Sequence, residues 1–478
     1  MPQARRRVRT AAAVVGDGLD AIRAELDVPT SFPPEVLAEA TASAEAPAVG
    51  DRTDRRELPF VTVDPEGSTD LDQAFAIEPT AGGGHVVWYA IADVAAFVEP
   101  GGHVDAEARR RGVTLYAPDG RAPLHPPVLS EGAASLLPGQ DRPAVLWRLA
   151  LDEGGQLADV GVERALVRSR EQLSYVDAQQ RIDAGDADLA TLRRVGEQRL
   201  AVERARGGVS LPVPEQEVVP DDGGFRLAYR APLPVEQWNA QLSLLCGMAA
   251  ADLMLAGGWG LLRTLPPADE ESLASLRRHA GALGVRWPDG ASYGEVIRAL
   301  DPATPEAAAF LIQATRLFRG ADHLPLVPGT PTDGEVTEHA AIAAPYAHVT
   351  APLRRLGDRF ATEAVLATTR GEDPPTWVRE ALPELPDLLR SAMSRASELE
   401  RAVVDHLEAL VLASHVGDRF PGIVVDERRD GVVVQLREPA VVAAVPGEHP
   451  LGAEVEVAVV AADPVARSVT LRIDGSAR

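Results

Sequence analysis

Residues 58–73 read LPFVTVDPEGSTDLDQ, an apolar run followed by a turn and then by closely spaced aspartates. The apolar, β-branched first part predicts a strand. Side chains two residues apart point to the same side of an extended segment, so Asp70 and Asp72 are expected to converge. Converging carboxylates repel one another unless a hard cation lies between them, and oxygen ligands suit Mg²⁺ or Mn²⁺. Together with Asp64, the stretch predicts a divalent-metal site; a polar turn around Gly67 is the alternative.

The sequence on either side of this stretch predicts a fold of the α+β class. Apolar periodicity indicates strands over residues 58–63, 85–92 and 144–151, and helices over residues 103–111 and 176–182. From residue 186 to residue 413 helical spacing dominates, interrupted by Pro/Gly-rich segments. We therefore expect one large domain over residues 51–413.

The texture changes again near the C-terminus, where short strands alternate with turn residues. The expected strands cover residues 420–425, 431–436, 440–445, 454–460 and 468–473. Such a succession predicts a small barrel of the oligonucleotide-binding (OB) kind over residues 414–478. Residues 1–50 are expected to be a short helical N-terminal region, with helices over residues 20–26 and 35–46.

The charge of the chain bears on nucleic-acid binding in two opposite ways. A formal net charge of −24 argues against non-specific attraction to a polyanion. All 47 basic side chains are arginine, however, and its planar guanidinium is the bidentate donor suited to phosphate. A local channel of arginines can bind phosphate inside an acidic shell.

The remaining global features predict a cytoplasmic protein. Cys246 is the only cysteine, so neither an internal disulfide nor a multi-cysteine metal site is expected. The arginines before residue 10 are followed by Asp17 and Asp20, which favours a basic tail over a targeting signal. The apolar residues 242–259 contain Asp252 and favour a buried helix over a membrane span. No membrane partner and no nicotinamide or flavin cofactor is expected.

A second segment with chemical potential covers residues 345–355, PYAHVTAPLRR. Thr350 as a cap, a proline in the first turn and the apolar spacing that follows predict a helix that starts here. Arg354 and Arg355 would then lie near a helix N-terminus, where guanidinium forks and the helix dipole together form a phosphate clamp. A solvated basic face paired with acidic residues is the alternative.

Taken together, the two segments resemble the catalytic domain of the ribonuclease II and ribonuclease R (RNB) family, over about residues 58–401. The family's Asp-Pro followed by a D-x-D-D cluster is similar to residues 64–73, and its T-S-P-[IV]-R-[RK]-Y segment is similar to residues 350–356. Connecting blocks also match in order and spacing: YAIADV at 89–94, RGVTLY at 111–116 and LSEGAASLLPG at 129–139.

The resemblance implies an exoribonuclease that hydrolyses single-stranded RNA from its 3′ end and releases nucleoside 5′-monophosphates. Asp64, Asp70 and Asp72, with Gln73 in the fourth position, would hold Mg²⁺ or Mn²⁺ and the scissile phosphodiester, and Asp72 would be the most sensitive of them. Arg354 would stabilise the transition state. The other implied RNA contacts are Tyr116, which would stack on the terminal base, and Tyr175, Arg355 and Glu400.

Several positions depart from the family pattern. Gln73 replaces the fourth aspartate, and its carbonyl oxygen is expected to ligate the metal more weakly, so that Gln73→Asp would lower the metal requirement. Leu211 stands where a second stacking aromatic is expected, and Ser243 stands where the family has asparagine. Residues 1–50 also leave no room for the family's paired cold-shock barrels. These departures keep an alternative open, a catalytically weakened relative that binds RNA 3′ ends.

Overall fold

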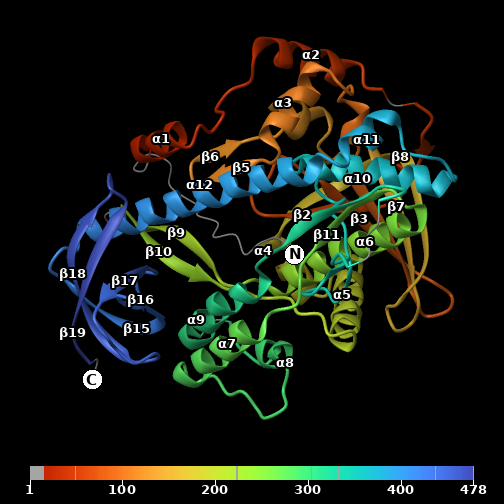
Figure 1. Cartoon of the computed structure of the whole chain (residues 1–478). Helices are drawn as coiled ribbons and strands as arrows, with labels where there is room; N and C mark the ends of the chain where they lie inside the picture. Colours follow the sequence, from red (N-terminus) through yellow and green to blue (C-terminus); the bar gives the residue numbers. More distant parts are fainter. Residues whose placement is uncertain are drawn as a thin grey trace.

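The computed structural model describes residues 16–48, 50–221, 224–302, 304–330, 334–436 and 438–476 (Figure 1). The basic tail predicted before residue 16 lies outside the described residues. The fold is α+β, with a large domain that carries a six-stranded sheet and a small all-β unit at the C-terminus, as the sequence predicts.

The six-stranded sheet has the order β1 (Thr53–Asp54), β8 (Leu157–Ser174), β2 (Phe60–Asp64), β3 (Gln73–Pro79), β4 (His85–Ala92) and β7 (Asp141–Leu151). The long strand β8 pairs antiparallel with β7 through residues 157–168 and parallel with β2 through residues 169–174. The sheet therefore closes on itself. This closure brings the end of β2 and the start of β3, where the aspartates lie, to one edge.

Strand β4 is apolar along its whole length because both faces of the sheet are covered. Val87 and Ile91 pack into the largest core cluster, which also contains residues of helix α6 (Pro234–Gly257). Ala90 and Ala92 point to the other side and pack in a cluster with residues of helix α2 (Pro34–Glu45). A continuous apolar run is what such a doubly covered strand requires.

The remaining elements of the large domain follow from the chain in order. They are α1 (Gly16–Glu25), η1 (Val94–Ala96), α3 (His103–Arg111), β5 (Leu115–Ala117), β6 (Gly120–Ala122), η2 (Leu129–Ala133), α4 (Tyr175–Asp183), α5 (Ala187–Ala205), β9 (Glu215–Asp221), β10 (Gly224–Arg230), β11 (Gly260–Thr264), α7 (Glu270–Ala282), α8 (Tyr293–Arg298), α9 (Pro305–Ala314), η3 (Thr315–Phe318), β12 (Asp322–Leu326), β13 (Glu338–His339), β14 (Ala344–Pro345), α10 (Leu356–Arg370), α11 (Thr376–Ala381) and α12 (Leu385–Ala413).

Helix α6 is the apolar helix that the sequence indicates around residues 242–259. Its length and composition alone would allow it to cross a membrane. In the structure it packs against α5, α10 and α4, and side chains such as Leu242 and Leu245 are buried in the main core. The helix ends at Gly257, and Gly258 adopts the left-handed conformation that closes it.

The C-terminal unit is a five-stranded, nearly closed barrel. Its strands β15 (Arg419–Arg428), β16 (Gly431–Leu436), β17 (Val442–Pro446), β18 (Glu454–Asp463) and β19 (Ser468–Ser476) pair in the order β17-β16-β15-β18-β19. Each expected strand is present within a few residues of its predicted position. The long helix α12 leads from the large domain to the barrel and packs against β18 and β19 (Figure 1).

The helix predicted to start at Thr350 begins six residues later than expected, at Leu356. Residues 350–355 form turns instead, because they pair with a neighbouring loop: Thr114 N–H donates to the Arg354 carbonyl at 3.0 Å, and Leu356 N–H donates to the Gly112 carbonyl at 3.1 Å. Thr350 is therefore not the cap. The Asp358 carboxylate in the first helical turn accepts a hydrogen bond from the Ala351 N–H at 2.8 Å and organises the turn.

Candidate active site

Asp72 is the point at which the two predicted segments meet. It lies directly before β3, and only 4% of its surface is exposed. Its Oδ1 accepts a hydrogen bond from the Leu353 N–H at 2.8 Å, and its Oδ2 accepts one from Arg354 Nε at 3.3 Å. Residues 281 and 282 positions apart in the sequence are thus joined at one carboxylate.

The surroundings of Asp72 disfavour its charge in the absence of a further cation. Burial raises the pKa of the Asp72 carboxyl to about 8; the Arg354 charge acts to lower it, and the Asp70 charge raises it again. The two carboxylates are therefore close enough to repel each other, as the even spacing of the aspartates predicts. An all-oxygen donor pair of this kind fits a hard divalent cation, which would favour both charges.

Asp70 is held by residues of the β5–β6 hairpin. Its Oδ1 accepts from Arg121 Nη1 at 2.5 Å, and its Oδ2 accepts from the Tyr116 hydroxyl at 3.3 Å. Arg121 also forms an ion pair with Glu131 at 2.9 Å. Tyr116 and Arg121 face each other in the hairpin register, and the side chain of Tyr116 is 37% exposed.

Arg121 was not among the residues predicted from the sequence. A signal for it exists, because the Asp119-Gly120 pair is typical of a hairpin turn and places residue 121 opposite Tyr116.

Gln73 makes hydrogen bonds with its whole amide group. Its Nε2 donates to the Thr350 carbonyl at 2.7 Å, and its Oε1 accepts from the Ser243 hydroxyl at 3.0 Å and from the Tyr89 hydroxyl. These contacts tie the start of β3 to the turn that carries Arg354. They occupy the carbonyl oxygen that was expected to ligate a metal, so the structure gives Gln73 a connecting position rather than a vacant ligand.

Asp64 is the last residue of β2 and pairs in register with Ser174, the residue before helix α4. Its charge lies near enough to Tyr89 to contribute to the raised pKa of that hydroxyl, whose first cause is burial. Among the described residues, no group of three or more His, Cys, Asp or Glu side chains is gathered as a metal site. The three aspartates therefore border one region without forming a finished ligand cage, and the metal ligands remain a prediction.

The two arginines of the second segment have different partners. Arg354 points toward Asp72, and its side chain is 24% exposed. Arg355 instead forms an ion pair with Asp358 at 2.6 Å, three residues along the chain. The expected clamp of two guanidinium groups is therefore wrong in this detail: one arginine faces the aspartates, and the other stabilises the start of α10.

The outlying predicted residues lie on separate elements. Tyr175 is the first residue of α4, next to Ser174, and its half-buried ring packs against the main core. Glu400 is half-buried in the middle of α12. Leu211 packs against a cluster that contains residues of α7 to α9 and of the barrel.

Comparison with known proteins identifies both parts of the chain. The RNB domain matches residues 52–369, and the RNase II-type exonuclease C-terminal S1 domain matches residues 418–474. Ribonuclease R of Aquifex aeolicus (strain VF5) is 29% identical over 446 residues, which cover 88% of this chain and 61% of that protein. Ribonuclease R of Escherichia coli (strain K12) is 28% identical over 415 residues, which cover 80% of this chain and 50% of that protein.

A solved structure has the same fold. Mycoplasma genitalium RNase R in complex with ribose methylated single-stranded RNA superposes with a TM-score of 0.82, at 20% identity, over 95% of this chain and 77% of that chain. The chain spans about half the length of the curated relatives it matches. Because the RNB match covers well over half of its 478 residues, the chain belongs to the RNB-domain family.

Proposed function

We propose that the chain is a metal-dependent exoribonuclease that hydrolyses single-stranded RNA in the 3′ to 5′ direction and releases nucleoside 5′-monophosphates. The observation that carries the proposal is the contact of the buried Asp72 carboxylate with both Leu353 N–H and Arg354. It joins an acidic cluster to a guanidinium at one partly exposed point, which is the donor set that a phosphodiester and its counter-ion require. The named relatives, both ribonuclease R, support the same activity.

Asp64, Asp70 and Asp72 would hold a divalent cation, Mg²⁺ or Mn²⁺. When bound, such an ion offsets charge on the phosphodiester and lowers the pKa of water. Asp72 and Asp70 supply the negative charge that the ion needs, and their mutual repulsion in its absence is an argument for it. Gln73 would act on this site indirectly, by holding the Thr350 turn against β3.

The remaining site residues would bind and orient the RNA. Arg354 lies beside Asp72 with part of its guanidinium exposed, so it can offset the charge that grows on the phosphoryl oxygens. Tyr116 offers an exposed ring at the edge of the same site. Stacking needs only a π-face, and this would make cleavage tolerant of base sequence. Tyr175 and Glu400 are further proposed RNA contacts, and the S1-type barrel would extend the grip on the strand.

We place this activity in the cytoplasm, where the single buried Cys246 would remain reduced.

The test is a cleavage assay on 5′-labelled single-stranded RNA with Mg²⁺ or Mn²⁺, with the parent chain, Asp72→Asn and a control, Asp387→Asn. Asp387 is a suitable control because its side chain is 88% exposed and lies on α12, in a surface ion pair with Arg390. The parent and the control should shorten the RNA from its 3′ end, whereas Asp72→Asn should retain RNA binding and lose cleavage. If the parent binds RNA 3′ ends but does not cleave with either metal, the binding module is the better assignment.

A further inference from the structure

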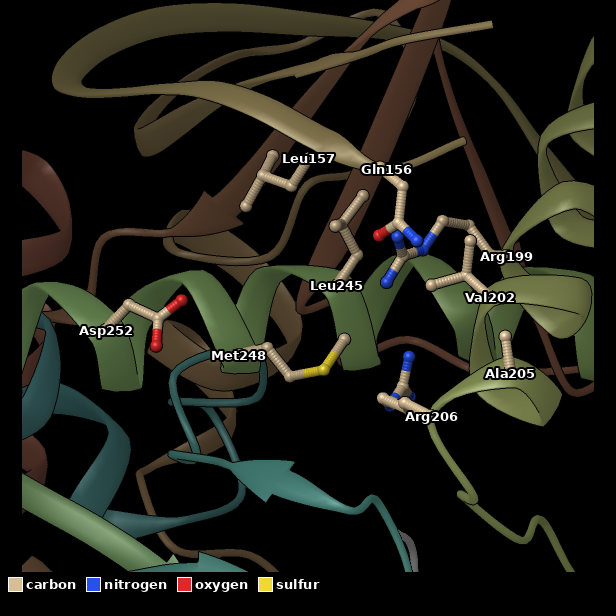
Figure 2. A pocket seen from close by; sticks show the side chains of 9 residues that line it. All are labelled: Gln156, Leu157, Arg199, Val202, Ala205, Arg206, Leu245, Met248 and Asp252. Carbon is tan, nitrogen blue, oxygen red and sulfur yellow. The ribbon is translucent and has the colours of Figure 1, made fainter. Parts of the chain in front are cut away.

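A pocket of about 350 Å³ lies between helices α5 and α6 and the turn that leads into β8. Figure 2 shows Arg199 and Arg206 on one side, with Leu245 and Met248 of α6 beside them and Asp252 at the opposite end. The residues that line this pocket are different from those assigned to the candidate active site. Its volume is within the range of pockets that bind small molecules, roughly 300–1,000 Å³.

The two arginines lie seven positions apart, at the end of α5 and just beyond it, so their side chains project from the same helix face. Arg199 is only 3% exposed, and its Nη1 donates to the Gly155 carbonyl at 2.7 Å. Arg206 Nε donates to the Ile342 carbonyl at 2.6 Å. Arg199 Nε and Arg206 Nη2 are buried and have no hydrogen-bond partner within the described residues. Both guanidinium groups therefore keep a donor in reserve.

Neither guanidinium is neutralised by the protein. Across the described residues, no Asp or Glu oxygen lies within the 4.0 Å of an ion pair with Arg199 or Arg206. The nearby Glu203 carboxylate is already bound by Ser210 and Gln241. Burial lowers the pKa of Arg199 to about 10, and the charge of Arg206 lowers it further.

This arrangement is unusual for the composition of the chain. Acidic side chains outnumber basic ones by 71 to 47, yet two adjacent cations lack an acidic partner. A buried charge without a counter-charge is costly, so the pair implies an anion supplied from outside the chain.

We infer that this pocket binds a small phosphate monoester of nucleotide size, with the phosphate on Arg199 and Arg206. Two guanidinium forks match the oxygens of a phosphate. The apolar wall formed by Leu245 and Met248 suits a sugar and base rather than bare phosphate. Asp252 at the far end disfavours a second anionic group and can accept an N–H from a base. A nucleoside monophosphate meets all three conditions, and the inference does not depend on whether the chain cleaves RNA.

The experiment is isothermal titration calorimetry of the full chain, without added metal, with 5′-AMP, 5′-UMP, inorganic phosphate and adenosine. The variants are Arg206→Gln and Arg199→Gln, and the matched control is Arg204→Gln, an exposed arginine on the same helix. Arg354→Gln is included to separate this pocket from nucleotide binding at the candidate active site.

A 5′-nucleotide should bind the parent chain more tightly than inorganic phosphate does, and adenosine should not bind detectably. Loss of charge-assisted hydrogen bonds to phosphate should weaken binding about 10- to 100-fold in Arg206→Gln. Binding should be unchanged in Arg204→Gln and should persist in Arg354→Gln. If buried Arg199→Gln fails to fold, Arg206→Gln alone decides.

Three outcomes would overturn the inference. One is unchanged nucleotide affinity in Arg206→Gln, and another is adenosine binding as tight as that of 5′-AMP. The third is no heat of binding from any phosphate compound at millimolar concentration. Equal weakening in Arg204→Gln would also overturn it, because attraction would then be a general effect of arginines on this face.

Discussion

The Gln73→Asp variant distinguishes two accounts of this position. If Gln73 were a weak metal ligand, an aspartate would complete the acidic cluster, and less metal would be needed for activity. The hydrogen bonds in the structure favour the opposite result. The Gln73 amide donates to the Thr350 carbonyl at 2.7 Å and accepts from Ser243 at 3.0 Å, and an aspartate is one methylene shorter and has no N–H to donate.

The size of the effect follows from these contacts. The substitution removes the hydrogen bond to Thr350, a residue that is 3% exposed, and leaves its carbonyl without that donor. An unsatisfied buried polar group costs about 1–3 kcal/mol, and the weakened contact with Ser243 adds about 1 kcal/mol. We therefore expect Gln73→Asp to lower the free energy of unfolding by roughly 2–4 kcal/mol. Because the Thr350 turn carries Arg354, cleavage should fall as well.

Two measurements check this reasoning: urea denaturation for stability, and the Mg²⁺ concentration that gives half-maximal cleavage of labelled RNA. Ser210→Ala is a control for the loss of a hydroxyl hydrogen bond elsewhere, since its partner is Glu203 rather than a site residue. The expected result is reduced stability with an unchanged or higher Mg²⁺ requirement. A Gln73→Asp variant of parental stability that needs less Mg²⁺ would refute the connecting position of Gln73 and restore it as a ligand.

Further predictions address the hairpin, the base platform and the buried histidines. Arg121→Gln should lower kcat about 10-fold, because Asp70 loses its ion pair and its position, whereas the exposed Arg148→Gln should have no effect; equal kcat in both would contradict the assignment. Tyr116→Leu should raise KM for RNA about 5- to 100-fold with kcat little changed, as loss of one stacked base predicts, and an unchanged KM would exclude stacking there. Burial lowers the pKa of His125 and of His323 from 6.5 to about 3, so both stay neutral in the folded chain while the unfolded chain takes up protons below pH 6.5. Stability is therefore fully present above pH 6.5 and should fall by roughly 2 kcal/mol per histidine between pH 7 and pH 5, whereas a flat urea-denaturation profile over this interval would count against it.

Much of the fold could be predicted because its signals are local. Strand β4 is an uninterrupted apolar run, and the barrel strands are separated by turn residues, so periodicity alone placed them. The start of α10 was misplaced because its determinants are not local. Thr350 and Pro352 satisfy the usual rules for a helix start, but pairing of residues 354–356 with residues 112–114 holds the chain extended until Leu356.

The acidic cluster was predictable for the same reason that the sheet was. Its spacing alone implied that Asp70 and Asp72 converge, and Asp70 does raise the pKa of Asp72. The fates of the two arginines were not predictable, because Arg354 and Arg355 are adjacent and chemically identical. Only the bridge between Arg355 and Val113, together with the ion pair to Asp358, decides which of them faces Asp72.

The departures at Gln73 and Ser243 are 170 positions apart in the sequence and look like two independent losses, an aspartate and an asparagine. In the structure they are one contact, in which the Ser243 hydroxyl donates to the Gln73 carbonyl oxygen at 3.0 Å. A pair of aspartate and asparagine can form the same contact with an amide as donor and a carboxylate as acceptor. The exchange therefore keeps a hydrogen bond between α6 and β3 and removes one negative charge beside Asp72. Since burial and Asp70 already disfavour the charge of Asp72, a neutral side chain at position 73 eases the accumulation of negative charge, and this is a physical reason for a functional site to retain three aspartates without the fourth.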